Sequence, residues 1–400
     1  MSVTAVGSLV AASPRRSPAT SGTTVPGGAA FHRVDRALVL SGGGARGSYQ
    51  AGLIAAIVAD RSLADGQPLS PYGLVCGTSI GALNGYFVAT GQYRLLRHLW
   101  YSIARQRVIR LKREFATIPE QQAGVATRIW QAMRLALGLN SRVKGVLDGA
   151  YLRDWLGQYI DPARPVLTPF VWTVTNLTTQ QPEFFALLPE APDAATKAAA
   201  VRALTATVGS GTVLRLATPD LLIDALQASA AIPIAFDPVT LPGVDGSPSQ
   251  YVDGGVTANT PVGVARAGAK AIDVVFLDPP IEAYSYGSAI EIASGAFGAM
   301  QKRILEADLR AAYFETFGKR AILGMNGHDP NNQASNGQAD SENLGRFVQS
   351  LYDVDIRTLR PQKELPVDVI GFDDERSLMD AYRIGYADAR RGFTPYATGF

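Results

Sequence analysis

Two short apolar runs in the first quarter of the chain each end at glycine. Residues 37–40 are continuously apolar and stop at a glycine-rich segment, and residues 73–76 do the same before Gly77. Runs of this length without alternation predict strands that are buried on both faces. A helical pattern follows each run, around Tyr49 in the first case and over residues 80–90 in the second. The repeated strand–loop–helix unit predicts an α/β fold with a largely parallel sheet.

Similar signals continue toward the end of the chain. Further strands are predicted over residues 170–176, 183–188, 251–253, 272–277 and 367–372. A helix is expected over 374–390 and a helical insert over 94–160, while 327–343, dense in Asn, Pro and Gly, is expected to be a mobile surface loop. Because no long linker separates the strands, we expect one domain over 34–400, preceded by a flexible tail over 1–33.

Composition narrows the classes of function. Apolar residues make up 47% of the 400 positions, which is enough for a full core. A net charge of +2, from 37 basic and 35 acidic residues, gives no reason to expect nucleic-acid binding. The single cysteine, Cys76, excludes a disulfide scaffold and is expected to be a buried small hydrophobe. Neither an export signal nor an apolar run of ~18 residues occurs, so we expect a cytoplasmic protein, at most peripheral to the membrane.

A serine lies between two glycines at the end of the second predicted strand. Gly77-Thr78-Ser79-Ile80-Gly81 has the spacing of a nucleophile elbow, in which a tight turn exposes the serine hydroxyl. Side chains at the two glycine positions would collide with neighbouring backbone. The helix that follows would direct its positive N-terminal end at a developing oxyanion. The same pattern also fits an ordinary strand-to-helix turn.

The first predicted strand ends in the loop Gly42-Gly43-Gly44-Ala45-Arg46-Gly47. Uncovered backbone N–H groups in such a loop suit the binding of negative charge. Because the next strand ends at the serine, the loop is predicted to form an oxyanion hole. Three of its glycines also match the dinucleotide fingerprint, so a non-catalytic nucleotide-binding module is the alternative, although no acid follows to hold the ribose. A tight turn without function is a third interpretation.

An aspartate lies at the end of a later predicted strand, in Asp253-Gly254-Gly255. An Asp-Gly pair by itself is typical of a turn. The histidines of the chain are His32, His98 and His328. These fall in the tail, the insert and the polar loop, so none is well placed to complete a serine–histidine–acid triad. The residues therefore favour a two-residue arrangement, in which Asp253 accepts the proton of Ser79 directly or through a water.

Four segments, in this order, resemble the motif set of the patatin-like phospholipases: 42–47, 77–81, 229–233 and 253–255. The resemblance implies a three-layer α/β/α fold and a lipid acyl hydrolase, a phospholipase A or esterase, that uses no metal or other cofactor. It also implies Ser79 as nucleophile, Asp253 as its base and the glycine loop as oxyanion hole, with Arg46 as the basic residue of that motif. Segment 229–233 is expected to pack behind the site.

A basic amphipathic segment is a candidate contact with an anionic membrane surface. No acidic residue falls between positions 94 and 113. The candidate contact residues are Arg94, Arg97, Trp100, Arg105, Arg107, Arg110, Lys112 and Arg113. The same pattern fits a solvated helix face that lies on the core. A second apolar stretch fits either a lid or acyl-chain wall or ordinary core packing, and it comprises Ile129, Trp130, Met133 and Leu137. The expected partner is a lipid or phospholipid substrate.

Overall fold

The first strand, β1 (Val34–Leu40), contributes side chains to two separate hydrophobic clusters. Leu38 and Leu40 belong to one cluster, and Ala37 and Val39 belong to the other. Because successive side chains of a strand point to opposite faces of its sheet, both faces are covered here, which explains the unbroken apolar run. The computed structural model describes residues 33–115, 125–138, 144–208, 212–279, 289–325 and 353–396.

The strand order along the main path of the sheet is β10-β9-β8-β1-β2-β3-β4-β5. The strands other than β1 are β2 (Leu74–Thr78), β3 (Phe170–Asn176), β4 (Gln181–Leu187), β5 (Val213–Leu216), β8 (Ala269–Val275), β9 (Asp355–Leu359) and β10 (Thr394–Pro395). Along this path β3–β4 and β9–β10 are antiparallel, and the other neighbouring pairs are parallel. The predicted mostly parallel sheet is confirmed.

A hairpin joins the sheet off this path, and its strands are β6 (Val239–Pro242) and β7 (Pro248–Asp253). Along one edge of β3, β2 pairs in parallel with the first half and ends at the Thr78–Thr173 pair. On the second half of that edge β7 runs antiparallel and ends at the Asp253–Val174 pair, while β4 occupies the other edge of β3 over its full length. The carboxyl ends of β2 and β7 therefore meet at the middle of β3.

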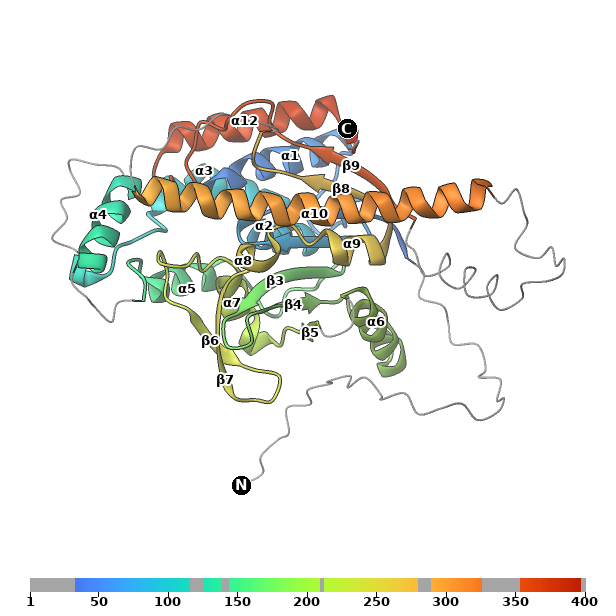
Figure 1. The fold of residues 1–400 in the computed structure, drawn as a ribbon, viewed down its shortest axis with the longest axis horizontal. Helices are drawn as coiled ribbons and strands as arrows, with labels where there is room; N and C mark the ends of the chain where they lie inside the picture. Colours follow the sequence, from blue (N-terminus) through green and yellow to red (C-terminus); the bar gives the residue numbers. More distant parts are fainter. Residues whose placement is uncertain are drawn as a thin grey trace, which may run out of the picture.

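Helices cover both faces of the sheet (Figure 1). The face that carries Leu38 packs against α1 (Gly47–Asp60), α2 (Ile80–Ala89), α3 (Tyr93–Gln106), α5 (Gly149–Gly157), α7 (Pro219–Ser229) and α12 (Glu375–Arg391). The opposite face packs against α6 (Ala194–Thr207), α9 (Val262–Gly268) and α10 (Ala289–Met325). The helix α4 (Val125–Gly138) adds Ile129 and Ala132 to the cluster on the Leu38 face, and the short elements are η1 (Gly44–Arg46), η2 (Arg113–Phe115) and α8 (Gly255–Ala258). The predicted three-layer α/β/α arrangement is confirmed.

The prediction of a strand over 367–372 is wrong, because these residues form turns and irregular structure. The carbonyl oxygen of Val369 instead accepts a hydrogen bond from the N–H of Ala45 at 2.8 Å. This segment therefore covers the glycine loop rather than pairing within the sheet. The structure instead has a strand shortly before this segment, β9, which the sequence pattern does not predict. Charged Asp355 and Arg357 interrupt its apolar positions, so a search for continuous apolar runs misses it.

The segment 94–160, predicted to be a helical insert, contains α4, α5 and all of α3 except its first residue. Within the ranges described above, no helix is both long and apolar enough to cross a membrane. Several predictions concern parts of the chain outside the described residues, namely residues 1–32, the loop 327–343 and the side chains of Trp130 and Leu137.

Helices α1 and α12 approach each other closely where each carries a glycine. A Cβ on Gly52 would lie 1.9 Å from the carbonyl oxygen of Tyr382. A Cβ on Gly385 would lie 1.9 Å from the carbonyl oxygen of Tyr49. The two backbones are therefore in contact, and α12 holds α1 in place directly after the glycine loop, which ends at Gly47.

The substitution Gly52→Ala should lower the free energy of unfolding by about 1–3 kcal/mol or more, because the added methyl group overlaps the α12 backbone. Gly318→Ala, inside α10 where a Cβ meets nothing within 4 Å, should raise that free energy by about 0.5–1 kcal/mol through helix propensity alone. Urea denaturation followed by circular dichroism measures both. Equal stability of the two variants would contradict the close contact.

Candidate active site

Ser79 lies at the turn between β2 and α2 in a strained backbone conformation. Its φ is 55° and its ψ is −125°, a combination that side-chain-bearing residues rarely adopt. A Cβ on Gly77 would lie 2.4 Å from the carbonyl oxygen of Gly81, and a Cβ on Gly81 would lie 2.2 Å from that of Leu40. Glycine at both positions therefore permits the turn, and Ser79 stands directly before the first residue of α2.

The hydroxyl of Ser79 donates a hydrogen bond to Asp253, with 2.6 Å between Oγ and Oδ2. The two residues are 174 positions apart in the sequence, and each is only 4% exposed. The other carboxylate oxygen, Oδ1, accepts the backbone N–H of Gly255 at 2.7 Å. Each oxygen of Asp253 is thus held by one donor, and the carboxylate is oriented with Oδ2 toward the serine.

Burial controls the acidity of this carboxylate. It raises the pKa of Asp253 from 3.8 to about 7, because the charged form loses its hydration in the site. The hydrogen bonds from Ser79 and Gly255 lower the pKa but do not offset the burial. A carboxylate with a pKa near neutrality is a better proton acceptor than an ordinary one.

Segment 229–233 connects the two sides of this site. The hydroxyl of Ser229 accepts the N–H of Ser79 at 2.9 Å and donates to the carbonyl oxygen of Thr173 at 2.7 Å. The carbonyl oxygens of Ser229 and Ala231 accept the N–H groups of Gly254 and Asp253 at 3.3 and 2.9 Å. The sequence interpretation of this segment as packing missed the Ser229 hydroxyl, because nothing in the local pattern places that hydroxyl beside Ser79.

Two backbone amides of the glycine loop are left without an acceptor in the described structure. The N–H of Gly42 donates to Asn259, that of Ala45 to Val369 and that of Arg46 to Gly43. Within the described part of the chain, the N–H groups of Gly43 and Gly44 have no acceptor. Gly44 shares a cavity wall with Ser79 and has a φ of 56°. The N–H of Gly47 donates to the carbonyl oxygens of Ala45 and Gly44, so the amides of Gly43 and Gly44 are the only ones of the predicted oxyanion loop 42–47 without an acceptor in the described structure.

Arg46, the basic residue of this loop, is engaged in ion pairs. Its Nη1 lies 2.5 Å from Oδ1 of Asp278, and its Nη2 lies 3.6 Å from Oε1 of Glu364. Its Nε donates to the carbonyl oxygen of Val367 at 3.4 Å. The guanidinium therefore ties the loop to the two segments that flank it.

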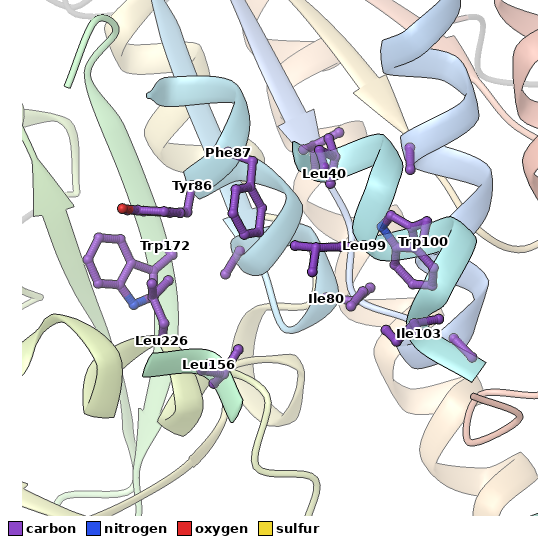
Figure 2. Close-up of a cluster of buried hydrophobic side chains, with 14 of the residues drawn as sticks. Leu40, Ile80, Tyr86, Phe87, Leu99, Trp100, Ile103, Leu156, Trp172 and Leu226 are labelled. Atoms are coloured by element: carbon purple, nitrogen blue, oxygen red, sulfur yellow. The ribbon is translucent and has the colours of Figure 1, made fainter. Parts of the chain in front are cut away.

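An apolar cavity leads to Ser79. The empty space there, with the open solvent at its mouth included, is about 850 Å³. Figure 2 shows several of its side chains facing one another from α2, α3 and α5. These are Ile80, Phe87, Leu99, Trp100, Ile103 and Leu156. Ser79 is one of the few polar residues on a surface that otherwise suits a hydrocarbon chain.

The predicted membrane contact is corrected at Trp100. This residue is 3% exposed, lines the cavity and donates its Nε1 hydrogen bond to Oδ1 of Asn84 at 2.9 Å. The amphipathic pattern of α3 therefore directs its tryptophan into the core. Lys112 is partly buried and pairs with Asp237 at 2.8 Å. The remaining predicted contact residues are exposed, and these are Arg94, Arg97, Arg105, Arg107, Arg110 and Arg113.

Cys76 and His98 are not part of the Ser79–Asp253 arrangement. Cys76 is fully buried in β2, and burial raises the pKa of its thiol well above the usual range. His98 is the only histidine among the described residues, and it is exposed on α3. His32 and His328 lie outside the described residues.

The substitution Ser229→Ala should lower the free energy of unfolding by about 1–3 kcal/mol, because the buried N–H of Ser79 and the carbonyl of Thr173 both lose a partner. Ser102→Ala serves as the control, since its hydroxyl bonds only within its own helix, donating to the carbonyl of His98 and accepting from Nε2 of Gln106. Urea denaturation measures both variants. If Ser229→Ala costs no more than the control, Ser229 does not hold the turn.

Comparison with known proteins agrees with these features. A family model described as patatin-like phospholipase matches residues 38–266, more than half of the chain. The crystal structure of VipD from Legionella pneumophila is similar, with 14% sequence identity and a TM-score of 0.35. That match covers 90% of this chain but 66% of VipD, so this chain spans less than two thirds of the VipD length. None of the curated proteins matches significantly. By the extent of the family match, the chain belongs to the patatin-like phospholipase family.

Proposed function

We propose that this protein is a serine-dependent lipid acyl hydrolase, a phospholipase A or esterase, with Ser79 as nucleophile and Asp253 as general base. The observation that carries the proposal is the 2.6 Å hydrogen bond from Ser79 Oγ to Asp253 Oδ2 at the end of an apolar cavity. A serine bonded to a base, beside a cavity lined mostly by apolar side chains, suits cleavage of a lipid ester. We assign this activity to a single domain over residues 34–400.

The reaction begins when Ser79 Oγ attacks the ester carbonyl carbon and its proton passes to Asp253 Oδ2. A tetrahedral oxyanion forms, and the C–O bond to the alcohol then breaks, with the proton from Asp253 passing to that alcohol. The acyl group remains on Ser79. A water then attacks the acyl carbonyl carbon and gives a proton to Asp253. The C–O bond to Ser79 breaks, that proton passes from Asp253 to Ser79 Oγ, and the fatty acid leaves. The pKa of about 7 suits Asp253 to both directions of proton transfer.

The amides of Gly43 and Gly44 are proposed to stabilise the oxyanion. They have no other acceptor in the described structure, and Gly44 lines the same cavity as Ser79. The N-terminus of α2, directly after Ser79, adds a positive partial charge. The N–H of Ser79 itself is taken by Ser229, which leaves the loop amides to hold the oxyanion. Arg46 supports this loop from its other side.

The alternative of a nucleotide-binding module has less support. Residues 367–372 lie over the glycine loop, and a Cβ on Gly44 would fall 2.0 Å from the carbonyl oxygen of Val369. The loop is therefore covered where a pyrophosphate would need open access. The next strand ends in the bonded Ser79 rather than in an acid that could hold a ribose.

The substitution Ser79→Ala should abolish both hydrolysis of a p-nitrophenyl ester and covalent labelling by a fluorophosphonate, because no other group is proposed to attack. Asp253→Asn should reduce kcat by about 10²-fold or more, as expected for loss of a general base. Ser102→Ala is the matched serine control and should keep full activity. Hydrolysis or labelling that persists in Ser79→Ala would overturn the assignment.

The dependence of kcat/KM on pH should show one ascending limb with a midpoint near 7. The sign follows from the mechanism, since Asp253 must be deprotonated to accept the proton of Ser79 and burial raises its pKa to about 7. Because an ordinary histidine titrates at about 6.5, the profile is also measured in a variant with His32, His98 and His328 all changed to Gln. The limb should stay in that variant, whereas its loss would establish a histidine base.

A further inference from the structure

Ile234 combines a strained backbone with an exposed apolar side chain. Its φ is 71°, in the left-handed region that a β-branched residue rarely enters, and its side chain is 59% exposed. A single exposed apolar residue is ordinary on a protein surface. A strained backbone conformation is not ordinary. It persists only where the surrounding structure enforces it, and such conformations concentrate at functional sites. Glycine or asparagine would take this conformation more easily.

Three chain segments hold Ile234 in this conformation. Its carbonyl oxygen accepts the N–H of Val146 at 3.3 Å, and it forms a parallel bridge with Gly145. The same Val146 accepts the N–H of Lys112 at 3.0 Å through its carbonyl oxygen. Segments 110–112, 145–148 and 233–236 therefore lie side by side, and we call them the rim segments.

The rim segments border the cavity that leads to Ser79. Leu147 lies within them and lines this cavity, and so does Phe236, two positions after Ile234. Ile232, two positions before Ile234, also lines it. Ile234 thus stands exposed between two residues whose side chains face the cavity. Ile234 therefore lies close in sequence to residues of the proposed acyl-chain site, with its own side chain exposed.

Basic residues lie on and beside the rim segments. The exposed ones are Arg107, Arg110, Arg113 and Lys144. Arg110 lies over the ring of Tyr151, with 3.7 Å between Cζ and the ring centroid. The acidic residues nearby are Glu114, which is exposed, Asp237, which pairs with Lys112, and Asp148, whose side chain accepts the N–H of Tyr151. Positive charge is therefore in excess around the apolar tip.

We propose that the rim segments dock on an anionic lipid bilayer, with Ile234 inserted among the lipids and Arg107, Arg110, Arg113 and Lys144 facing the headgroups. This rests on the proposed function, because a lipid hydrolase must draw its substrate out of a membrane. An apolar tip within a ring of long cationic side chains is the pattern of interfacial binding. Docking would place the cavity mouth, beside Ile232 and Phe236, against the acyl chains.

The test is sedimentation of the full chain with two kinds of vesicle, one of phosphatidylcholine alone and one with about a third phosphatidylglycerol. The wild type should bind the anionic vesicles and release them at high salt. The variants Ile234→Gly and Ile234→Asn should lower the vesicle partition coefficient about tenfold or more. Both should melt at the wild-type temperature or above, because the new residue fits the backbone conformation. Retained stability thus separates lost docking from misfolding.

The charges are tested by a double variant, Arg110→Gln with Lys144→Gln. At about fivefold for each cation near an anionic surface, it should lower partitioning about 25-fold. The controls lie on elements that cover the opposite face of the sheet. They are Phe317→Asn for an exposed apolar side chain of α10 and Lys197→Gln with Arg202→Gln for two exposed cations of α6. Both controls should partition like the wild type.

Several results would overturn the docking proposal. These are no binding of the wild type to anionic vesicles, equal binding to both kinds of vesicle, or wild-type partitioning of the Ile234 or charge variants. Hydrolysis of the soluble p-nitrophenyl ester by the wild type tests the proposed function separately. If that ester is cleaved but the rim variants still bind vesicles, docking at the rim fails alone. If it is not cleaved, the hydrolase assignment fails whatever the vesicles show.

Discussion

One edge of β3 brings the two reactive groups together. β2 runs up the first half of this edge and β7 runs down the second half, so their carboxyl ends face each other at the Thr173–Val174 step. Ser79 follows β2 directly, and Asp253 is the last residue of β7. Thr173 also accepts the Ser229 hydroxyl that holds the Ser79 amide, so the same strand positions the serine, the carboxylate and their support. Ser79 and Asp253, 174 positions apart in the sequence, are in contact because β2 and β7 both pair with β3 in this register.

The surroundings of this contact decide what it can do. Burial at the meeting point raises the pKa of Asp253, and the cavity that begins at Ser79 is lined mostly by apolar side chains. The close packing of α12 on α1, and the cover of residues 367–372 over the loop, leave the amides of Gly43 and Gly44 as the unpaired donors of the described loop. A carboxylate with a raised pKa, two amides without acceptors in the described structure and an apolar cavity thus arise from one packing arrangement.

The sequence predicts the parts of this site that depend on local sterics. Gly77 and Gly81 are recognisable because the turn at Ser79 leaves no room for side chains, and the apolar run of β1 reports its burial on both faces. The pairing of β7 with β3 is not local. The link between Ser79 and Asp253 is therefore predicted only indirectly, from the lack of a well-placed histidine and from the family resemblance. Trp100 shows a further limit of prediction from sequence. The amphipathic pattern of α3 predicts a helix, but it does not tell whether Trp100 lies on the buried or on the exposed face. The charged residues of β9 likewise make this strand hard to predict from its own sequence, because it forms by pairing with β8 and β10.

A crystal structure of the protein after reaction with a long-chain alkyl fluorophosphonate would test the shared edge of β3 as the basis of catalysis. The phosphorus should be bonded to Ser79 Oγ, with the phosphoryl oxygen within hydrogen-bond distance of the Gly43 and Gly44 amides. The alkyl chain should extend into the cavity between Ile80 and Leu99. Phosphorus on another residue, or a chain that lies outside this cavity, would contradict the assignment of Ser79 and Asp253 as the reacting pair.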